Sequence, residues 1–105
     1  LPEIAAAVGG RIDVLVDGGI RHGSDVAKAL ALGARAVLVG RPTLYGTAVA
    51  GRDGAALVLA ILREELLYTM AMLGRLTVAD IGPGVLFDPV GHSRSACRLP
   101  AAGRG

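Results

Sequence analysis

Aromatic residues, lysine and cysteine are scarce in this sequence of 105 residues. Two Tyr, one Phe and no Trp leave too few rings for a platform on which nucleic-acid bases could stack. Lys28 is the one lysine among 11 basic residues, and these are interspersed with 9 acidic residues. A net charge of +2 without a basic cluster predicts no nucleic-acid partner. Cys97 stands alone, so we expect no disulfide framework, no metal site and a location in the reducing cytoplasm.

Long apolar runs without charge are also missing. The most apolar long stretch, residues 55–73, carries Arg63, Glu64 and Glu65 in its middle, which argues against a membrane-spanning helix. The amino terminus has neither an initiator Met nor a basic region before an apolar run. We therefore expect no signal peptide, and we expect the chain to be a fragment of a longer protein. Apolar residues still make up 52% of the chain, which predicts one folded domain rather than disorder.

Helices and strands are predicted to alternate along the chain. The expected elements are a helix at 3–8, a strand at 12–16, a helix at 24–32, a strand at 35–39, a short helix from 42 and a long helix at about 55–73. Ser24 is the predicted N-cap of the 24–32 helix, and Asp53-Gly54 are predicted to form the loop before the long helix. Nearly continuous apolar strands are typical of parallel strands buried on both faces. The fold class is therefore α/β.

Two strands alone make an incomplete parallel sheet, because both outer edges and one apolar face lack partners. We expect a two-stranded parallel unit with an exposed apolar face, which a larger α/β sheet or barrel would complete. Pro and Gly become frequent after residue 81. Residues 1–86 are predicted to form the folded segment, and residues 87–105 an irregular or disordered tail.

Two turns that contain glycine and arginine follow the predicted strands. They are Asp17-Gly18-Gly19-Ile20-Arg21 after the first strand and Gly40-Arg41-Pro42 after the second. Glycine lets backbone amides approach a ligand closely, and arginine can donate two parallel hydrogen bonds to a phosphate. A helix that starts at Pro42 would direct its free amides and its positive end toward an anion. Because the two strand ends meet at one edge of the sheet, the pair of turns predicts a phosphate site.

Simpler interpretations of the same residues stay open. The glycines could serve only as turns, and the arginines could simply be solvated. Asp17 could cap a helix, bind a ribose or ribityl hydroxyl, or act as a catalytic acid. His22 and His92 are interpreted as loop and tail residues rather than catalytic groups. The sequence has no Walker A, G-x-G-x-x-G, G-x-S-x-G or H-E-x-x-H motif, which argues against the nucleotide-binding, hydrolase and metalloprotease classes that use them.

Longer stretches of the sequence resemble one enzyme family. The segments VLVDGGIRHGSDVAKALALGARAVLVGRPTLYG and LREELLYTMAMLG are similar to the carboxyl-terminal part of the FMN-dependent 2-hydroxy acid oxidases and dehydrogenases. The resemblance runs from residue 1 to about residue 86, and the tail does not share it. It implies strands seven and eight of a (β/α)₈ TIM barrel, with FMN as the cofactor. The residues implied to hold the FMN phosphate and ribityl chain are Asp17, Gly18, Gly19, Ile20, Arg21, Gly40 and Arg41.

The resemblance also implies an activity, the oxidation of a small 2-hydroxy acid to a 2-oxo acid. The family's catalytic histidine lies in an S-N-H-G-G-type motif that this sequence does not contain, so no catalytic residue is assigned. We expect the intact protein to be a homo-oligomer and the chain alone to be inactive. Two alternatives are a segment of another FMN barrel enzyme, such as type 2 isopentenyl diphosphate isomerase, and a remnant without catalysis.

Overall fold

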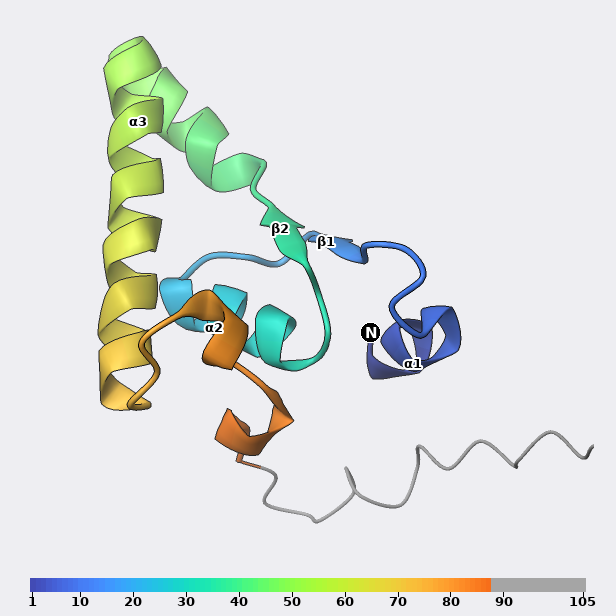
Figure 1. The fold of residues 1–105 in the computed structure, drawn as a ribbon. Helices are drawn as coiled ribbons and strands as arrows, with labels where there is room; N and C mark the ends of the chain where they lie inside the picture. Colours follow the sequence, from blue (N-terminus) through green and yellow to red (C-terminus); the bar gives the residue numbers. More distant parts are fainter. Residues whose placement is uncertain (88–105) are drawn as a thin grey trace, which may run out of the picture.

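The computed structural model describes residues 1–87, and the helices and strands alternate within them as predicted (Figure 1). In chain order the elements are α1 (Pro2–Val8), β1 (Leu15–Asp17), α2 (Gly23–Ala31), β2 (Ala36–Leu38), α3 (Arg41–Met72) and two 3₁₀ turns, η1 (Val78–Asp80) and η2 (Pro83–Val85). The predicted tail lies outside these residues apart from Phe87, so its disorder stays a prediction. No helix among residues 1–87 is long and apolar enough to cross a bilayer.

The sheet consists of β1 and β2, which pair in parallel with Val16 opposite Val37. Both strands are shorter than the predicted 12–16 and 35–39. One further bond, from the Arg35 N–H to the Val14 carbonyl at 2.7 Å, continues the pairing before β1. Among residues 1–87 neither strand has a neighbour on its outer edge, and unpaired edges favour short strands, which explains the shortening.

One face of the sheet is covered and the other is open, as predicted. Val16 and Val37 pack on a cluster of buried side chains, Ile20, Ala29 and Ala34, that joins the sheet to α2. Leu15 and Leu38 point to the opposite face and are 57% and 51% exposed. The described residues therefore form a parallel unit with an uncovered apolar face.

Helix α2 also packs against α3 on its other side. Ala31 of α2 is buried with Met70 of α3 and Ile81, and this cluster attaches the turns that follow α3 to the two helices. Figure 1 shows α2 between the sheet and the carboxyl-terminal part of α3, with α1 set apart beside β1. The first residue of α2 and the body of α3 are thus neighbours, although they are far apart in the sequence.

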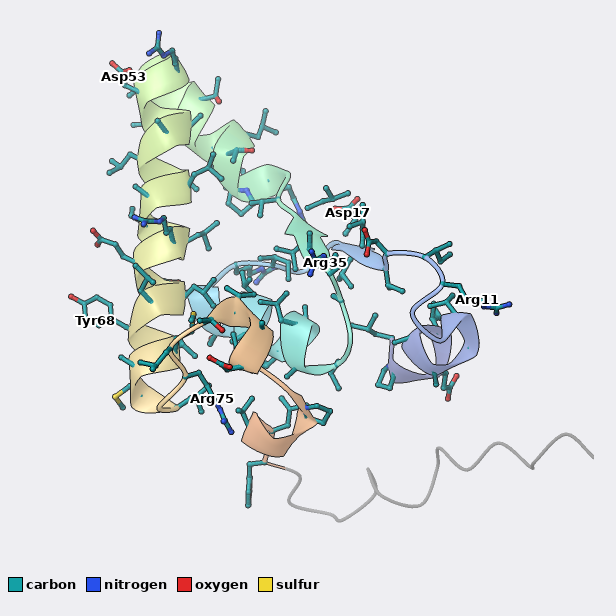
Figure 2. The ribbon with its side chains drawn as sticks, viewed as in Figure 1. Arg11, Asp17, Arg35, Asp53, Tyr68 and Arg75 are labelled. Carbon is teal, nitrogen blue, oxygen red and sulfur yellow. The ribbon has the colours of Figure 1, made fainter. Side chains whose placement is uncertain are left out.

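Helix α3 is a hairpin of two limbs rather than one straight rod. Ala50 and Gly51 have non-helical backbone angles, and Gly51 has φ 56° and ψ −136°, a conformation that favours glycine. The limbs, residues 41–49 and 52–72, are pressed together where the buried glycines Gly46 and Gly54 meet backbone to backbone. The predicted loop at Asp53-Gly54 is wrong, because the chain reverses at Gly51 and both residues belong to the second limb. Figure 2 shows Asp53 at the reversing end of the hairpin.

Candidate functional site

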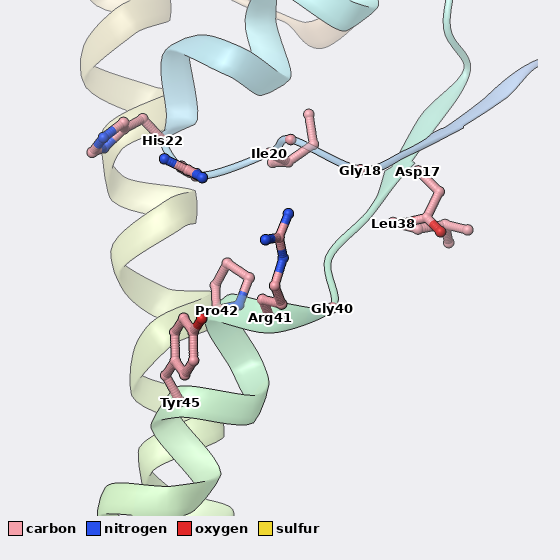
Figure 3. Close-up of a pocket in the computed structure, with 11 residues that line it drawn as sticks. Asp17, Gly18, Ile20, His22, Leu38, Gly40, Arg41, Pro42 and Tyr45 are labelled. Atoms are coloured by element: carbon pink, nitrogen blue, oxygen red, sulfur yellow. The ribbon is translucent and has the colours of Figure 1, made fainter.

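A cleft of about 780 Å³ lies at the carboxyl ends of β1 and β2. All seven residues predicted to hold a phosphate and ribityl chain line it. Pro42 of the second predicted turn also lines it, together with three residues that the sequence did not single out as ligand-binding, His22, Leu38 and Tyr45. Figure 3 shows the cleft between the loop that follows β1 and the first turn of α3, with the Arg41 side chain directed from α3 toward that loop.

In the loop after β1, one side chain is buried and its neighbours are exposed to solvent. Gly18 and Gly19 turn the chain with φ of 96° and 77°, which residues with a Cβ rarely adopt. Ile20 is only 8% exposed because its side chain belongs to the cluster beneath the sheet. Arg21, the next residue, is exposed. The apolar anchor at Ile20 therefore presents the Arg21 guanidinium at the rim of the cleft.

The first turn of α3 forms the facing wall. Gly40 is the N-cap, and its carbonyl accepts hydrogen bonds from the Thr43 hydroxyl at 2.7 Å and from the Leu44 N–H at 3.2 Å. The first N–H groups of a helix have no partner within the helix, and Pro42 has no N–H. The amides of Arg41 and Thr43 and the Arg41 guanidinium therefore lie together at the positive end of a helix.

Gly40 leaves open space at the start of α3. Its φ is −103°, which other residues can adopt, and a Cβ built on it would meet no protein atom within 4 Å. The space beside the Gly40 backbone is therefore open among residues 1–87, and a ligand can approach the backbone closely there. The residues present fit a phosphate group held by amides and two arginines.

The start of α2, in contrast, is already occupied by carboxylates. Asp25 accepts hydrogen bonds from the Arg21 N–H at 3.1 Å and the His22 N–H at 3.0 Å. These two backbone bonds hold the pKa of the Asp25 carboxyl below its ordinary value. The Gly23 N–H donates to Glu65 of α3 at 2.7 Å. The predicted N-cap at Ser24 is wrong. These carboxylates accept the backbone hydrogen bonds before Ser24, so the helix begins at Gly23 and His22 is the N-cap.

Asp17 does not act as a helix cap among the described residues. Asp25 fills that position at α2, and Asp17 is the last residue of β1. Asp17 is exposed and lies on the open face of the sheet, paired with Leu38 in the strand register. Figure 3 shows the Asp17 carboxylate beside Leu38, away from Arg41. Of the open interpretations, ligand contact and acid catalysis remain for this side chain.

The histidine and carboxylate side chains of residues 1–87 do not gather into a metal site, since no three of them come close enough to share an ion. His22 has its Nδ1 atom 3.5 Å from the Glu65 Oε2 atom. Glu65 had no signal in the sequence beyond its place in a charged helix. Only the three-dimensional contact between α2 and α3 shows that it reaches the cleft loop.

Comparison with known proteins places the chain in one family. A family model described as FMN-dependent dehydrogenase matches residues 1–88. The L-lactate oxidase of Nostoc sp. is 52% identical over 86 residues, which is 82% of this chain and 24% of that protein. A solved mandelate oxidase with a monooxide FMN adduct has a TM-score of 0.73 and 54% identity, and covers 75% of this chain and 25% of its own.

One further relative extends the similarity into the carboxyl-terminal part of the sequence. The pre-mycofactocin synthase of Mycolicibacterium smegmatis is 48% identical over 103 residues, which is 98% of this chain and 26% of that protein. The match therefore continues beyond residue 88, where the family model's match ends. The chain spans about a quarter of the length of each of these relatives.

Proposed function

Since the chain belongs to the FMN-dependent dehydrogenase family, we propose that it is the FMN-binding segment of an enzyme that oxidises a 2-hydroxy acid to a 2-oxo acid. The observation that carries the proposal is the cleft at the carboxyl ends of β1 and β2, which Arg21, Gly40 and Arg41 line together. The relatives named as lactate and mandelate oxidases support the substrate class. The segment would act within a full-length flavoprotein, since it spans only about a quarter of its relatives.

The two strands are proposed to be strands seven and eight of a (β/α)₈ barrel. Their open apolar face, with Leu15 and Leu38, suits the barrel interior, where side chains of other strands would cover it. Ligands of such barrels bind at the carboxyl ends of the strands, commonly with a phosphate near the loops after the last two. The cleft lies at that end of the sheet.

The FMN phosphate is assigned to the start of α3 rather than to the start of α2. The carboxylates of Asp25 and Glu65 already accept hydrogen bonds from the backbone N–H groups at the beginning of α2. Their negative charges would repel a phosphate there. At α3 the amides of Arg41 and Thr43 are available, and both arginines can neutralise the dianion. Asp17, which lies exposed on the open face of the sheet, is proposed to accept a hydrogen bond from a ribityl hydroxyl.

Within the mechanism this segment would bind and orient the cofactor. FMN, when bound, supplies the acceptor for the two electrons that leave the substrate. The arginines and the helix amides would hold the phosphate end of the cofactor and so would limit its movement in the site. The catalytic base, the electron acceptor after FMN, the homo-oligomeric assembly and the cytoplasmic location are assigned to the full-length protein as predictions.

The proposal is tested by flavin content and turnover of the full-length protein. We expect the purified protein to carry FMN and to oxidise lactate, glycolate or mandelate, with bleaching of the flavin absorbance under anaerobic conditions. Isomerisation of isopentenyl diphosphate without 2-hydroxy acid oxidation would instead support the isomerase alternative. A protein that carries no flavin would support the alternative of a remnant without catalysis.

A second candidate function follows from the carboxyl-terminal match. The similarity to pre-mycofactocin synthase covers 98% of this chain, against 82% for the Nostoc L-lactate oxidase. This favours a role like the one that the relative's name states, the synthesis of pre-mycofactocin, with the same FMN site. An FMN-loaded protein that leaves simple 2-hydroxy acids unchanged would favour this second candidate.

Gly40→Ala provides a direct test of the phosphate position. We expect a roughly 10-fold higher FMN dissociation constant, because a methyl group at the start of α3 would fill the space that the phosphate needs. Stability of the apoprotein should stay unchanged, since that methyl group meets no protein atom within 4 Å. The measurement is quenching of flavin fluorescence on titration. Gly82→Ala is the matched control, because Gly82 has equally open surroundings outside the cleft. Unchanged FMN affinity in Gly40→Ala would place the phosphate elsewhere.

A further inference from the structure

The two walls of the cleft belong to separate parts of the chain, and one of the long-range contacts between these parts is a polar one. Arg21 stands on the loop between β1 and α2, and Arg41 stands on the first turn of α3. The Glu65 carboxylate, on the second limb of α3, accepts the Gly23 N–H at 2.7 Å across 42 residues of sequence. Gly23 directly follows the end of the loop that carries Arg21. The contact therefore links the helix that carries one arginine to the loop that carries the other.

The geometry of this contact leaves little freedom. A Cβ at Gly23 would overlap the backbone of Glu65 and Leu66, so the first turn of α2 lies directly on the body of α3. The hydrogen bond is charge-assisted, and it satisfies an amide that is otherwise orphaned at a helix start. The same Oε2 atom lies 3.5 Å from His22 Nδ1, but side-chain exposures of 68% and 38% make that pair a minor contributor.

We propose that Glu65 is a positioning residue for the FMN phosphate, acting through the Gly23 amide. It fixes the distance between the Arg21 loop and the start of α3, so both guanidinium groups reach one phosphate. It also fills the start of α2 with negative charge, which leaves the start of α3 as the place where the anion binds. The inference rests on the proposed function, because it assumes a phosphate in the cleft.

The test uses the full-length flavoprotein and measures dissociation constants of FMN and of riboflavin, which lacks the phosphate. We expect Glu65→Ala to raise the FMN constant roughly 10-fold, as loss of one hydrogen bond to a charged group does at its lower limit, and to leave the riboflavin constant unchanged. Glu65→Gln keeps an oxygen acceptor for the Gly23 N–H and should restore most of the affinity.

Glu64→Ala is the matched control, because Glu64 has the same charge on the same helix turn and is exposed to solvent. Glu65→Asp, one methylene too short to reach Gly23, serves if the alanine variant does not fold, and should behave as predicted for it. Unchanged FMN affinity in Glu65→Ala or Glu65→Asp would overturn the proposal, as would equal losses for FMN and riboflavin. If Arg41→Ala also leaves FMN binding unchanged, the proposed function itself fails. If only the Glu65 variants leave FMN binding unchanged, the positioning role alone fails.

Discussion

Gly54→Ala is expected to destabilise the full-length protein, although alanine is the better helix former. Helix propensity alone would make the variant more stable by about 1 kcal/mol. In α3, however, a Cβ on Gly54 would overlap the backbone of Gly46 on the other limb. Overpacking costs about 1–3 kcal/mol, and more where the neighbour is backbone that cannot rotate away. We therefore expect a net loss of about 2 kcal/mol or more in the free energy of unfolding, measured by denaturant titration.

The sign of the change in the free energy of unfolding shows whether helix propensity or overpacking dominates in Gly54→Ala. Gly84→Ala is the control, since a Cβ there meets no protein atom within 4 Å and its φ is not positive. Its stability should stay within about 0.5 kcal/mol of the wild type. Because the first limb of α3 carries Arg41, Gly54→Ala should also weaken FMN binding. A Gly54→Ala protein as stable as the wild type would show that the two limbs do not cross as closely as described.

Replacement of both cleft arginines is expected to give the largest loss of cofactor. A hydrogen bond to a charged group contributes about 1.5–3 kcal/mol, so Arg21→Ala and Arg41→Ala should each raise the FMN dissociation constant roughly 10- to 150-fold. The double variant should lose roughly 10²- to 10⁴-fold, with departure from additivity because both side chains face one phosphate. Arg41→Lys should recover part of the loss, since lysine keeps the charge and loses the fork.

Riboflavin separates a phosphate contact from a general effect on the fold. The double variant should bind riboflavin as the wild type does, because the missing guanidinium groups would have contacted only the phosphate. Added salt should weaken FMN binding to the wild type more than to the double variant, since screening acts on the charges that the variant lacks. Arg63→Ala, an exposed arginine on the second limb of α3, serves as the control. Equal losses for FMN and riboflavin would contradict the phosphate assignment.

Local signals in the sequence were sufficient for the alternation of elements and for the cleft. Apolar, β-branched runs marked both strands, and glycine and arginine after each strand marked the two walls. These signals work because a parallel sheet brings its carboxyl ends to one edge, whatever the details of packing. Pro42 likewise marked the start of a helix within one residue.

Contacts between distant residues account for what the sequence did not predict. Asp53-Gly54 is an ordinary turn signal, but Gly54 is needed for the close crossing with Gly46, and the reversal falls at Gly51 instead. Ser24 is a good N-cap by type, but Glu65, 42 residues after Gly23, takes the neighbouring amide and moves the helix start. Neither the position of the reversal nor the start of α2 can be predicted from neighbouring residues in the sequence, because a distant residue of α3 determines each of them.

Cooperativity of unfolding follows from the open strand face. Leu15 and Leu38 gain only part of their burial from this segment, and both sheet edges are unpaired among the described residues. In the proposed enzyme the rest of that burial comes from the neighbouring strands of the barrel, so the hydrophobic gain is shared between the segment and the remainder. Parts that stabilise each other in this way unfold together in one transition. A packing defect at the α3 hairpin is then expected to lower the melting temperature of the whole molecule rather than to cause local fraying.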